Sequence, residues 1–136
     1  MDKDGFVGAL NEDLRSEYQS IVQYIHHVST VTGVEFLTVI DELKLHVVQE
    51  LSHAQILAEQ IAFLGGTPAV TVPPVDTATG REALEADLRL EEAQLERYRE
   101  RFAQAMELGL ADVAEAIRPL LEQTQEHVRD LQAALG

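Results

Sequence analysis

The sequence predicts an all-α protein, a bundle of four helices with one long crossover between the second helix and the third. Two observations lead to this prediction. Apolar residues recur at the 3.6-residue spacing of an α-helix along almost the whole chain, with Ala, Leu, Glu and Gln between them. Breaks that contain glycine divide this pattern at three places, which leaves four segments long enough to be helices.

The expected helices span residues 6–31, 35–64, 80–108 and 111–135. Thr32-Gly33 separates the first two helices, and Gly-Gly-Thr-Pro at 65–68 is a strong stop after the second. Thr79 and Glu82 have the spacing of a capping box, which predicts where the third helix begins. Gly109 is expected to close the third helix in a left-handed conformation.

The connections predict the direction of each helix. The short breaks at Gly33 and Gly109 require antiparallel neighbours. The link from Gly65 to Ala78 contains three prolines and is stiff, and its about 14 residues can reach roughly 45 Å. A helix of about 30 residues has that length. The link can therefore return the chain to the far end of the bundle, giving an up-down-down-up arrangement in one domain over residues 1–136.

Composition excludes several classes of function. The 136 residues include no cysteine, which excludes thiolate chemistry, iron–sulfur clusters and disulfides. The formal charge of −14 disfavours nucleic acids and anionic membrane surfaces. Because the sequence shows neither a secretory leader nor an apolar run of about 18 residues, we expect a cytoplasmic protein without a membrane span.

Polar residues interrupt the inward stripe of every helix near its middle. In chain order they are Glu17, Glu50, His53, Glu91, Thr124 and His127. A carboxylate in an apolar core costs several kcal/mol unless it is neutralised, and three at one level also repel each other. None of the ten Lys and Arg residues lies on these stripes. A bound metal ion is therefore favoured over structural ion pairs, which are the alternative.

An internal repeat strengthens the case for a metal. The two halves match at an offset of 74 residues, which aligns Glu17, Tyr24, Glu50 and His53 with Glu91, Tyr98, Thr124 and His127. Residues at i and i+3 share one face of a helix, so each half can direct its side chains to the same point. Oxygen and imidazole donors without sulfur suit Fe(II), or alternatively Mn(II). A Glu from each of two helices with Glu-x-x-His from the others is the di-iron carboxylate arrangement.

The chain also resembles the bacterioferritin branch of the ferritin-like family over nearly its whole length. The resemblance is carried by LNEDLRSEY at 10–18, QYIHH at 23–27, ELSHAQILAEQIAFLGGTP at 50–68, DLRLE at 87–91 and EHVRDL at 126–131. It implies that Glu17 and Glu91 are terminal ligands of two irons, Glu50 bridges them, and His53 and His127 each bind one. It also implies that Tyr24 is a catalytic residue beside the centre, and that Fe(II) is oxidised by O₂ or peroxide and then stored or released.

One departure from the family concerns the fourth helix, where Thr124 stands in place of a second bridging glutamate. Two divalent ions with three carboxylates carry a net charge of about +1, where a fourth carboxylate would make it zero. One unit charge at 4 Å is worth about 4 kcal/mol at an effective dielectric near 20, so the affinity for the second metal is expected to fall by about a hundredfold or more. Glu122 and Glu126 point away from the stripe unless Pro119 distorts the helix. Gln123 or a water is the other substitute.

Two further departures concern haem and assembly. The haem-ligating methionine of bacterioferritins would fall at Leu51, so haem is not expected. The chain ends at Gly136 directly after the fourth helix, without the short fifth helix that helps to close a 24-subunit cage. A homo-oligomer is still expected, and dimers or a smaller assembly are as credible as a hollow shell.

Four other aromatic or imidazole residues lie near the stripes. We interpret His46 as partly buried or exposed, with an accessory metal-binding role as the alternative. His26 and His27 are interpreted as structural, and His27 is the better candidate of the two for another role. Tyr98 is expected to fill the core, with packing against the site as the alternative.

Three functional hypotheses remain. The first is an iron-binding ferroxidase, the second a non-catalytic degenerate bundle that binds one metal or none and serves as a scaffold, and the third a rubrerythrin-like peroxide reductase. Anaerobic Fe(II) titration followed by O₂ or peroxide distinguishes them. Uptake of two irons with oxidation by O₂ would favour the ferroxidase. Absence of uptake would favour the non-catalytic bundle, and selective turnover of peroxide would favour the peroxide reductase.

Overall fold

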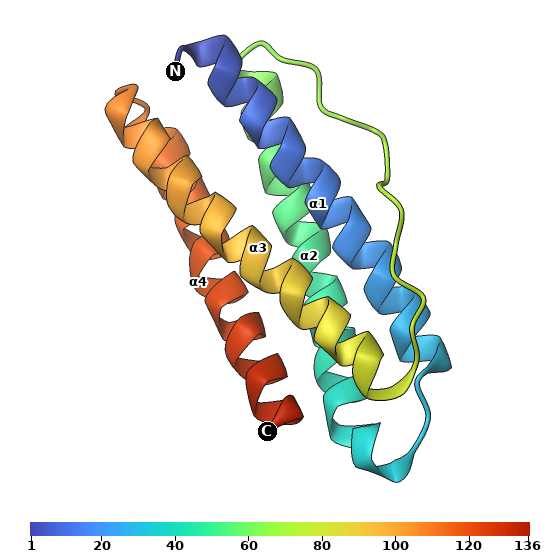
Figure 1. The fold of residues 1–136 in the computed structure, drawn as a ribbon. Helices are drawn as coiled ribbons and strands as arrows, with labels where there is room; N and C mark the ends of the chain where they lie inside the picture. The colour runs from blue at the N-terminus through green and yellow to red at the C-terminus, as the bar shows by residue number, and fades with distance from the viewer.

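Four long helices make up most of the chain, and the computed structural model describes all residues from 1 to 136. They are α1 (Lys3–Thr30), α2 (Leu37–Phe63), α3 (Gly80–Glu107) and α4 (Ala111–Leu135), and a 3₁₀ turn at Val34–Phe36 precedes α2. Helices α1 and α2 form one antiparallel hairpin, and α3 and α4 form the other (Figure 1). The link between the hairpins runs back along α1, so the helices run up, down, down and up. The predicted four-helix bundle with one long crossover is confirmed.

The helix ends agree with the predicted ones to within a few residues. Helix α1 begins at Lys3 because the Asp2 side chain caps it, with Oδ1 accepting from the Gly5 N–H at 2.8 Å. Thr79 directly precedes α3, as predicted, but the predicted capping box is wrong, because the Thr79 side chain makes no capping bond. Gly80, the first residue of α3, has a φ of +59°, so the helix begins with a left-handed backbone conformation rather than with helical dihedral angles. Helix α3 is closed, as predicted, by Gly109 with a φ of +73°.

Hydrogen bonds to side chains of α1 hold the crossover in place. Asn11 donates from Nδ2 to the Thr67 carbonyl at 3.1 Å and accepts from the Ala69 N–H at 2.8 Å. Further along, the Asp76 N–H donates to Oε1 of Gln23 at 2.9 Å. These contacts satisfy backbone groups of a segment without secondary structure of its own. The crossover therefore lies against the first hairpin along the length of α1.

The apolar core consists of two clusters with a polar layer between them. The larger cluster lies toward the N-terminal end of α1 and includes Phe6, Leu10, Leu14, Leu57, Ile61, Ile117 and Leu120. The smaller cluster lies toward the opposite end and consists of Tyr24, Val39, Leu43, Leu84 and Leu131. Polar residues at the middle of each helix separate the clusters. None of the four helices is both long and apolar enough to span a membrane.

A seam of buried polar side chains joins α1 to α3. At one end Arg101 donates from Nε and Nη2 to the two carboxylate oxygens of Asp13, at 2.7 and 2.9 Å. At the other end Nδ1 of His27 lies 2.8 Å from Oδ1 of Asp87. The two ends are related by the 74-residue repeat, which aligns Asp13 with Asp87 and His27 with Arg101. The interpretation of His27 as structural agrees with this placement.

The His27–Asp87 pair is expected to make stability depend on pH. Burial lowers the pKa of His27, but the hydrogen bond and charge of Asp87, together with Asp76, raise it by more, so the pKa lies above its ordinary value. A raised pKa means that the folded protein binds this proton more tightly than the unfolded chain. The stabilisation is therefore complete below pH ~6.5 and is lost as the pH rises through the folded-state pKa.

Urea unfolding between pH 5.5 and 9 measures this dependence. His27→Gln, which keeps a hydrogen-bond donor but cannot titrate, is expected to flatten the fall in unfolding free energy on the alkaline side. The matched control is His26→Gln, a change at the neighbouring half-buried position. A wild-type profile identical to that of His27→Gln would contradict the prediction.

Candidate metal centre

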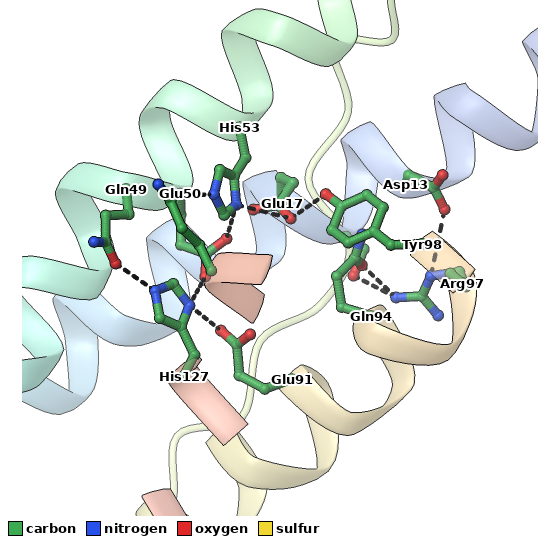
Figure 2. Close-up of polar contacts among 12 residues, drawn as sticks. Asp13, Glu17, Gln49, Glu50, His53, Glu91, Gln94, Arg97, Tyr98 and His127 are labelled. Atoms are coloured by element: carbon green, nitrogen blue, oxygen red, sulfur yellow. Dashed lines mark hydrogen bonds and ion pairs between the residues drawn. The ribbon is translucent and has the colours of Figure 1, made fainter. Parts of the chain in front are cut away.

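The five predicted ligands meet at one level of the bundle (Figure 2). Glu17 projects from α1, Glu50 and His53 from α2, Glu91 from α3 and His127 from α4, and none is more than 1% exposed. Their donor atoms form two groups, each with all atoms within 4.8 Å of one another. One group is Glu17, Glu50 and His53, and the other is Glu50, Glu91 and His127. Glu50 belongs to both groups.

Within each group an imidazole nitrogen faces two carboxylates. Nδ1 of His53 lies 3.4 Å from Oε2 of Glu50 and 3.7 Å from Oε1 of Glu17. Nδ1 of His127 lies 2.9 Å from Oε1 of Glu50 and 3.5 Å from Oε1 of Glu91. The two groups thus use the same kinds of atom in the same arrangement, as the internal repeat predicts.

Two glutamines orient the imidazoles, a role that the sequence did not predict for either of them. Nε2 of His53 lies 2.7 Å from Oε1 of Gln123, and Nε2 of His127 is hydrogen-bonded to Oε1 of Gln49. A glutamine oxygen accepts a hydrogen bond, so in each histidine Nε2 donates its N–H to a glutamine, and Nδ1 is the nitrogen that faces the carboxylates. Gln49 and Gln123 are 74 residues apart. Extending the repeat to neighbours of the ligands would have found them.

Two tyrosines hold the terminal glutamates. The Tyr24 hydroxyl donates to Oε1 of Glu91 at 2.7 Å, and the Tyr98 hydroxyl donates to Oε1 of Glu17. Both tyrosines are fully buried. Tyr98 was expected to fill the core, and it does pack in the larger apolar cluster, but it also contacts the site. Each terminal glutamate therefore has one oxygen held by a tyrosine and the other available.

The atoms left without partners fit a divalent cation. Oε2 of Glu17, Oε2 of Glu91 and Nδ1 of His53 are buried and have no hydrogen-bond partner. No Lys or Arg forms an ion pair with Glu17, Glu50 or Glu91. Buried carboxylate oxygens without a donor are costly, and one ion in each group would satisfy them. Structural ion pairs, the alternative considered from the sequence, are not what neutralises these glutamates.

The same crowding shifts the proton affinities of the carboxyl groups. Burial raises the pKa of Glu50 well above its ordinary value, and the charges of Glu17 and Glu91 raise it further. Burial also acts to raise the pKa of Glu91, but hydrogen bonds from His127, Glu50 and Tyr24 outweigh it and lower that pKa to about 2. The metal-free centre therefore holds a proton at Glu50 and a negative charge at Glu91.

Position 124 provides no carboxylate, and its neighbours do not replace one. Thr124 is fully buried, and its Oγ1 has no hydrogen-bond partner. Helix α4 continues through Pro119, and Glu122 and Glu126 both remain exposed on its outer face. The predicted distortion that would turn one of them inward is therefore absent. Gln123 does not take the place of the missing ligand either, because its side chain contacts His53.

The prediction for His46 is wrong in one respect. This side chain is only 2% exposed, whereas a partly buried or exposed position was expected. Its ring stacks on that of His127, with centroids 3.9 Å apart, and its Nε2 lies 3.2 Å from Oδ2 of Asp130. Burial lowers the pKa of His46, and the neighbouring His127 lowers it further. The inward position arises from packing of α2 against α4, which the pattern of α2 alone does not reveal.

Comparisons with known proteins agree with this arrangement. The model of the ferritin-like domain family matches residues 7–136. The bacterioferritin of Desulfovibrio desulfuricans is 26% identical over 125 residues, which cover 90% of this chain and 69% of that protein. A ferritin-like di-iron carboxylate protein from Bacillus anthracis superposes with a TM-score of 0.94 at 30% identity over the full length of both chains. Rhodobacter capsulatus bacterioferritin, solved with a metal-free dinuclear site and haem iron, gives 0.87 at 28% identity, covering 99% of this chain and 85% of that one.

Proposed function

The chain belongs to the ferritin-like family, and from this premise we propose that it is a ferroxidase, which binds Fe(II) and oxidises it for storage or detoxification. Glu17, Glu50 and His53 would hold one iron, and Glu50, Glu91 and His127 the other. Glu50 would bridge the two ions. Iron is here the substrate, and Mn(II) is the alternative metal for the same oxygen and nitrogen donors.

One observation carries the proposal. Two groups of three donors share Glu50, and three of their buried atoms have no partner other than a cation that would enter between them. The donors include no sulfur and come from all four helices. Carboxylates with one imidazole per ion favour iron in both oxidation states, because hard oxygen donors stabilise the higher charge of Fe(III).

The reaction balances with either oxidant. Two Fe(II) give two electrons to O₂, which takes up two protons and leaves as hydrogen peroxide, while the irons become Fe(III). With peroxide as oxidant, two electrons and two protons convert it to two waters. The contribution of the chain is to hold two ions side by side, to direct the imidazole Nδ1 atoms toward them, and to release the Glu50 proton when metal binds.

Anaerobic Fe(II) titration followed by O₂ tests the proposal. We expect two irons per chain, the second more weakly bound, and one O₂ consumed for two Fe(II) oxidised. Faster oxidation by peroxide than by O₂ would instead favour a peroxide reductase. Absence of Fe(II) uptake would contradict the proposal and support a non-catalytic bundle.

Tyr24 is expected to act as a positioning residue for Glu91. Tyr24→Phe removes the 2.7 Å hydrogen bond to Oε1 and leaves that buried oxygen without a donor. A hydrogen bond to a charged group is worth about 1.5–3 kcal/mol, so we expect Fe(II) oxidation to slow by about tenfold or more. The pH at which oxidation is half-maximal should rise, because the Tyr24 bond lowers the pKa of Glu91. Stopped-flow kinetics across pH measure both effects.

The third tyrosine provides the control for this variant. Tyr18 packs against the larger apolar cluster and makes no hydrogen bond with the centre. Tyr18→Phe should leave both the rate and its pH profile as in the wild type. A Tyr24→Phe enzyme with normal rate and pH profile would exclude a positioning role for that hydroxyl.

The proposal includes a homo-oligomer in the cytoplasm, built from one domain per chain. Support for assembly comes from apolar side chains that α1 and α2 leave exposed, namely Val22, Ile25, Leu45, Val48 and Leu51. Such residues are typical of surfaces that pair with another protein. Measurement of the molecular mass in solution tests the assembly, and cell fractionation tests the location.

A further inference from the structure

The internal repeat allows the residues beside the metal centre in one half of the bundle to be compared with those at the matching positions of the other half. The offset of 74 residues relates His46 to Leu120 and Asp130 to Ile56. Leu120 is fully buried in the larger apolar cluster, and Ile56 packs against that cluster. In one half of the bundle this position is therefore filled by hydrocarbon. In the other half it holds an imidazole and a carboxylate, with Nε2 of His46 3.2 Å from Oδ2 of Asp130.

The inner side of this pair touches the metal centre. The His46 ring stacks on that of His127 with an interplanar angle of 21°, and its centroid lies 5.9 Å from that of Tyr24. Nδ1 of His46 is buried and has no hydrogen-bond partner. The ring is thus held by stacking and by Asp130, and no bond on its inner side fixes it. An imidazole with a free nitrogen in contact with a ligand is not explained by packing.

The outer side of the pair opens to solvent between α2 and α4. The Asp130 side chain is 46% exposed and borders two surface cavities of about 270 and 510 Å³. The smaller cavity is also lined by Glu35 and Glu42, and no Lys or Arg lines it. Three carboxylates around one hollow raise the local concentration of divalent cations. A cation that collects there lies next to Asp130, and through it next to His46.

We propose that His46 and Asp130 form a third divalent-cation site, outside the two-metal centre, which passes Fe(II) from the α2–α4 groove to that centre. The donor spacing fits, because two donors each at about 2.1 Å from one ion and at right angles lie about 3 Å apart. Glu42 lies one helical turn before His46 on the same face of α2 and can supply a further oxygen or a water-mediated contact. Delivery to the centre rests on the proposed ferroxidase function, whereas cation binding at this site does not.

Co(II) titration of the purified chain tests the site, with calorimetry to count the ions. We expect three ions per chain in the wild type and two in Asp130→Asn. The double variant His46→Leu with Asp130→Ile reproduces the hydrocarbon pair of the other half of the bundle and should also bind two. Glu122→Gln is the matched control, because it removes one negative charge from α4, as Asp130→Asn does, but at an exposed position. This variant should still bind three ions.

Two further measurements complete the test. One is anomalous scattering from crystals soaked in Co(II), and the other is the rate at which Fe(II) is oxidised. Anomalous scattering should place an ion between His46 and Asp130 in the wild type and not in Asp130→Asn. With Fe(II) limiting, oxidation should slow at least tenfold in Asp130→Asn, without a change in Fe(II) affinity at the centre.

The possible outcomes separate this site from the proposed function. Equal Co(II) stoichiometry in Asp130→Asn and Glu122→Gln would overturn the third site. A third ion at His46 in a chain that does not oxidise Fe(II) would support the site and overturn the ferroxidase. Unchanged oxidation in Asp130→Asn, with the third ion lost, would overturn the delivery role.

Discussion

Glu50→Gln is expected to abolish tight binding of both metal ions while leaving the metal-free fold intact. Glu50 is the one residue that belongs to both donor groups. Each ion loses a unit of negative charge at about 4 Å, worth about 4 kcal/mol at an effective dielectric near 20, which weakens binding by about a thousandfold. The metal-free protein loses little, because the raised pKa of Glu50 means that its carboxyl is already neutral and the amide has the same shape.

Co(II) calorimetry and urea unfolding measure the two parts of this prediction. Glu92→Gln changes the net charge by the same amount at an exposed position next to Glu91, and should bind metal as the wild type does. If Glu50→Gln retained two tightly bound ions, the two-group description of the centre would be wrong. If the Glu50→Gln protein were unfolded without metal, its loss of binding would say nothing about the centre. Glu17→Gln, which changes one donor group only, would then take its place as the test variant. We expect Glu17→Gln to lose one ion.

Thr124→Glu is expected to strengthen binding of the second ion by about a hundredfold or more. The repeat places position 124 opposite Glu50, and a carboxylate there would reduce the charge of the loaded centre from about +1 to zero. The same change should destabilise the metal-free protein by several kcal/mol, because a fourth buried carboxyl joins three others in an apolar interior. The difference in melting temperature between loaded and metal-free protein should therefore widen.

Thr124→Gln separates charge from size. The glutamine adds nearly the same volume as the glutamate of Thr124→Glu, at the same fully buried position, but it adds no carboxylate. It should share part of the destabilisation of the metal-free protein and none of the gain in affinity. Equal second-ion affinities for Thr124→Glu and the wild type would show that the missing carboxylate does not weaken the site.

The fold could be predicted because its determinants are local. Helical periodicity and the glycine breaks define four helices, and the length of the proline-containing link defines their directions. The capping bond predicted at Thr79 is absent where the next residue, Gly80, has a positive φ instead of helical dihedral angles. A capping motif predicts a side-chain bond only when the residues that follow it adopt helical dihedral angles from the start.

The site was predictable where it depends on spacing along a helix and not where it depends on contacts between helices. Glu50 and His53 share a face by their separation of three residues, and the repeat supplies Glu91 and His127. The burial of His46 and the pairing of Asp13 with Arg101 depend on which faces of two helices meet. A periodic pattern identifies the inward face of a helix but not the side chain that lies opposite it.

The two donor groups are distributed unequally over the two hairpins, and this difference has a mechanical consequence. Glu17, Glu50 and His53 all come from the first hairpin, whereas Glu91 and His127 come from the second and meet Glu50 across the gap. Contacts within each hairpin are more extensive than those between them. An ion in the second group would therefore link the two hairpins directly, whereas the ligands of an ion in the first group all come from one hairpin, because position 124 is a threonine. Loss of the ion from the second group should let the two hairpins separate more easily, and amide hydrogens along their shared boundary should then exchange sooner than those inside either hairpin.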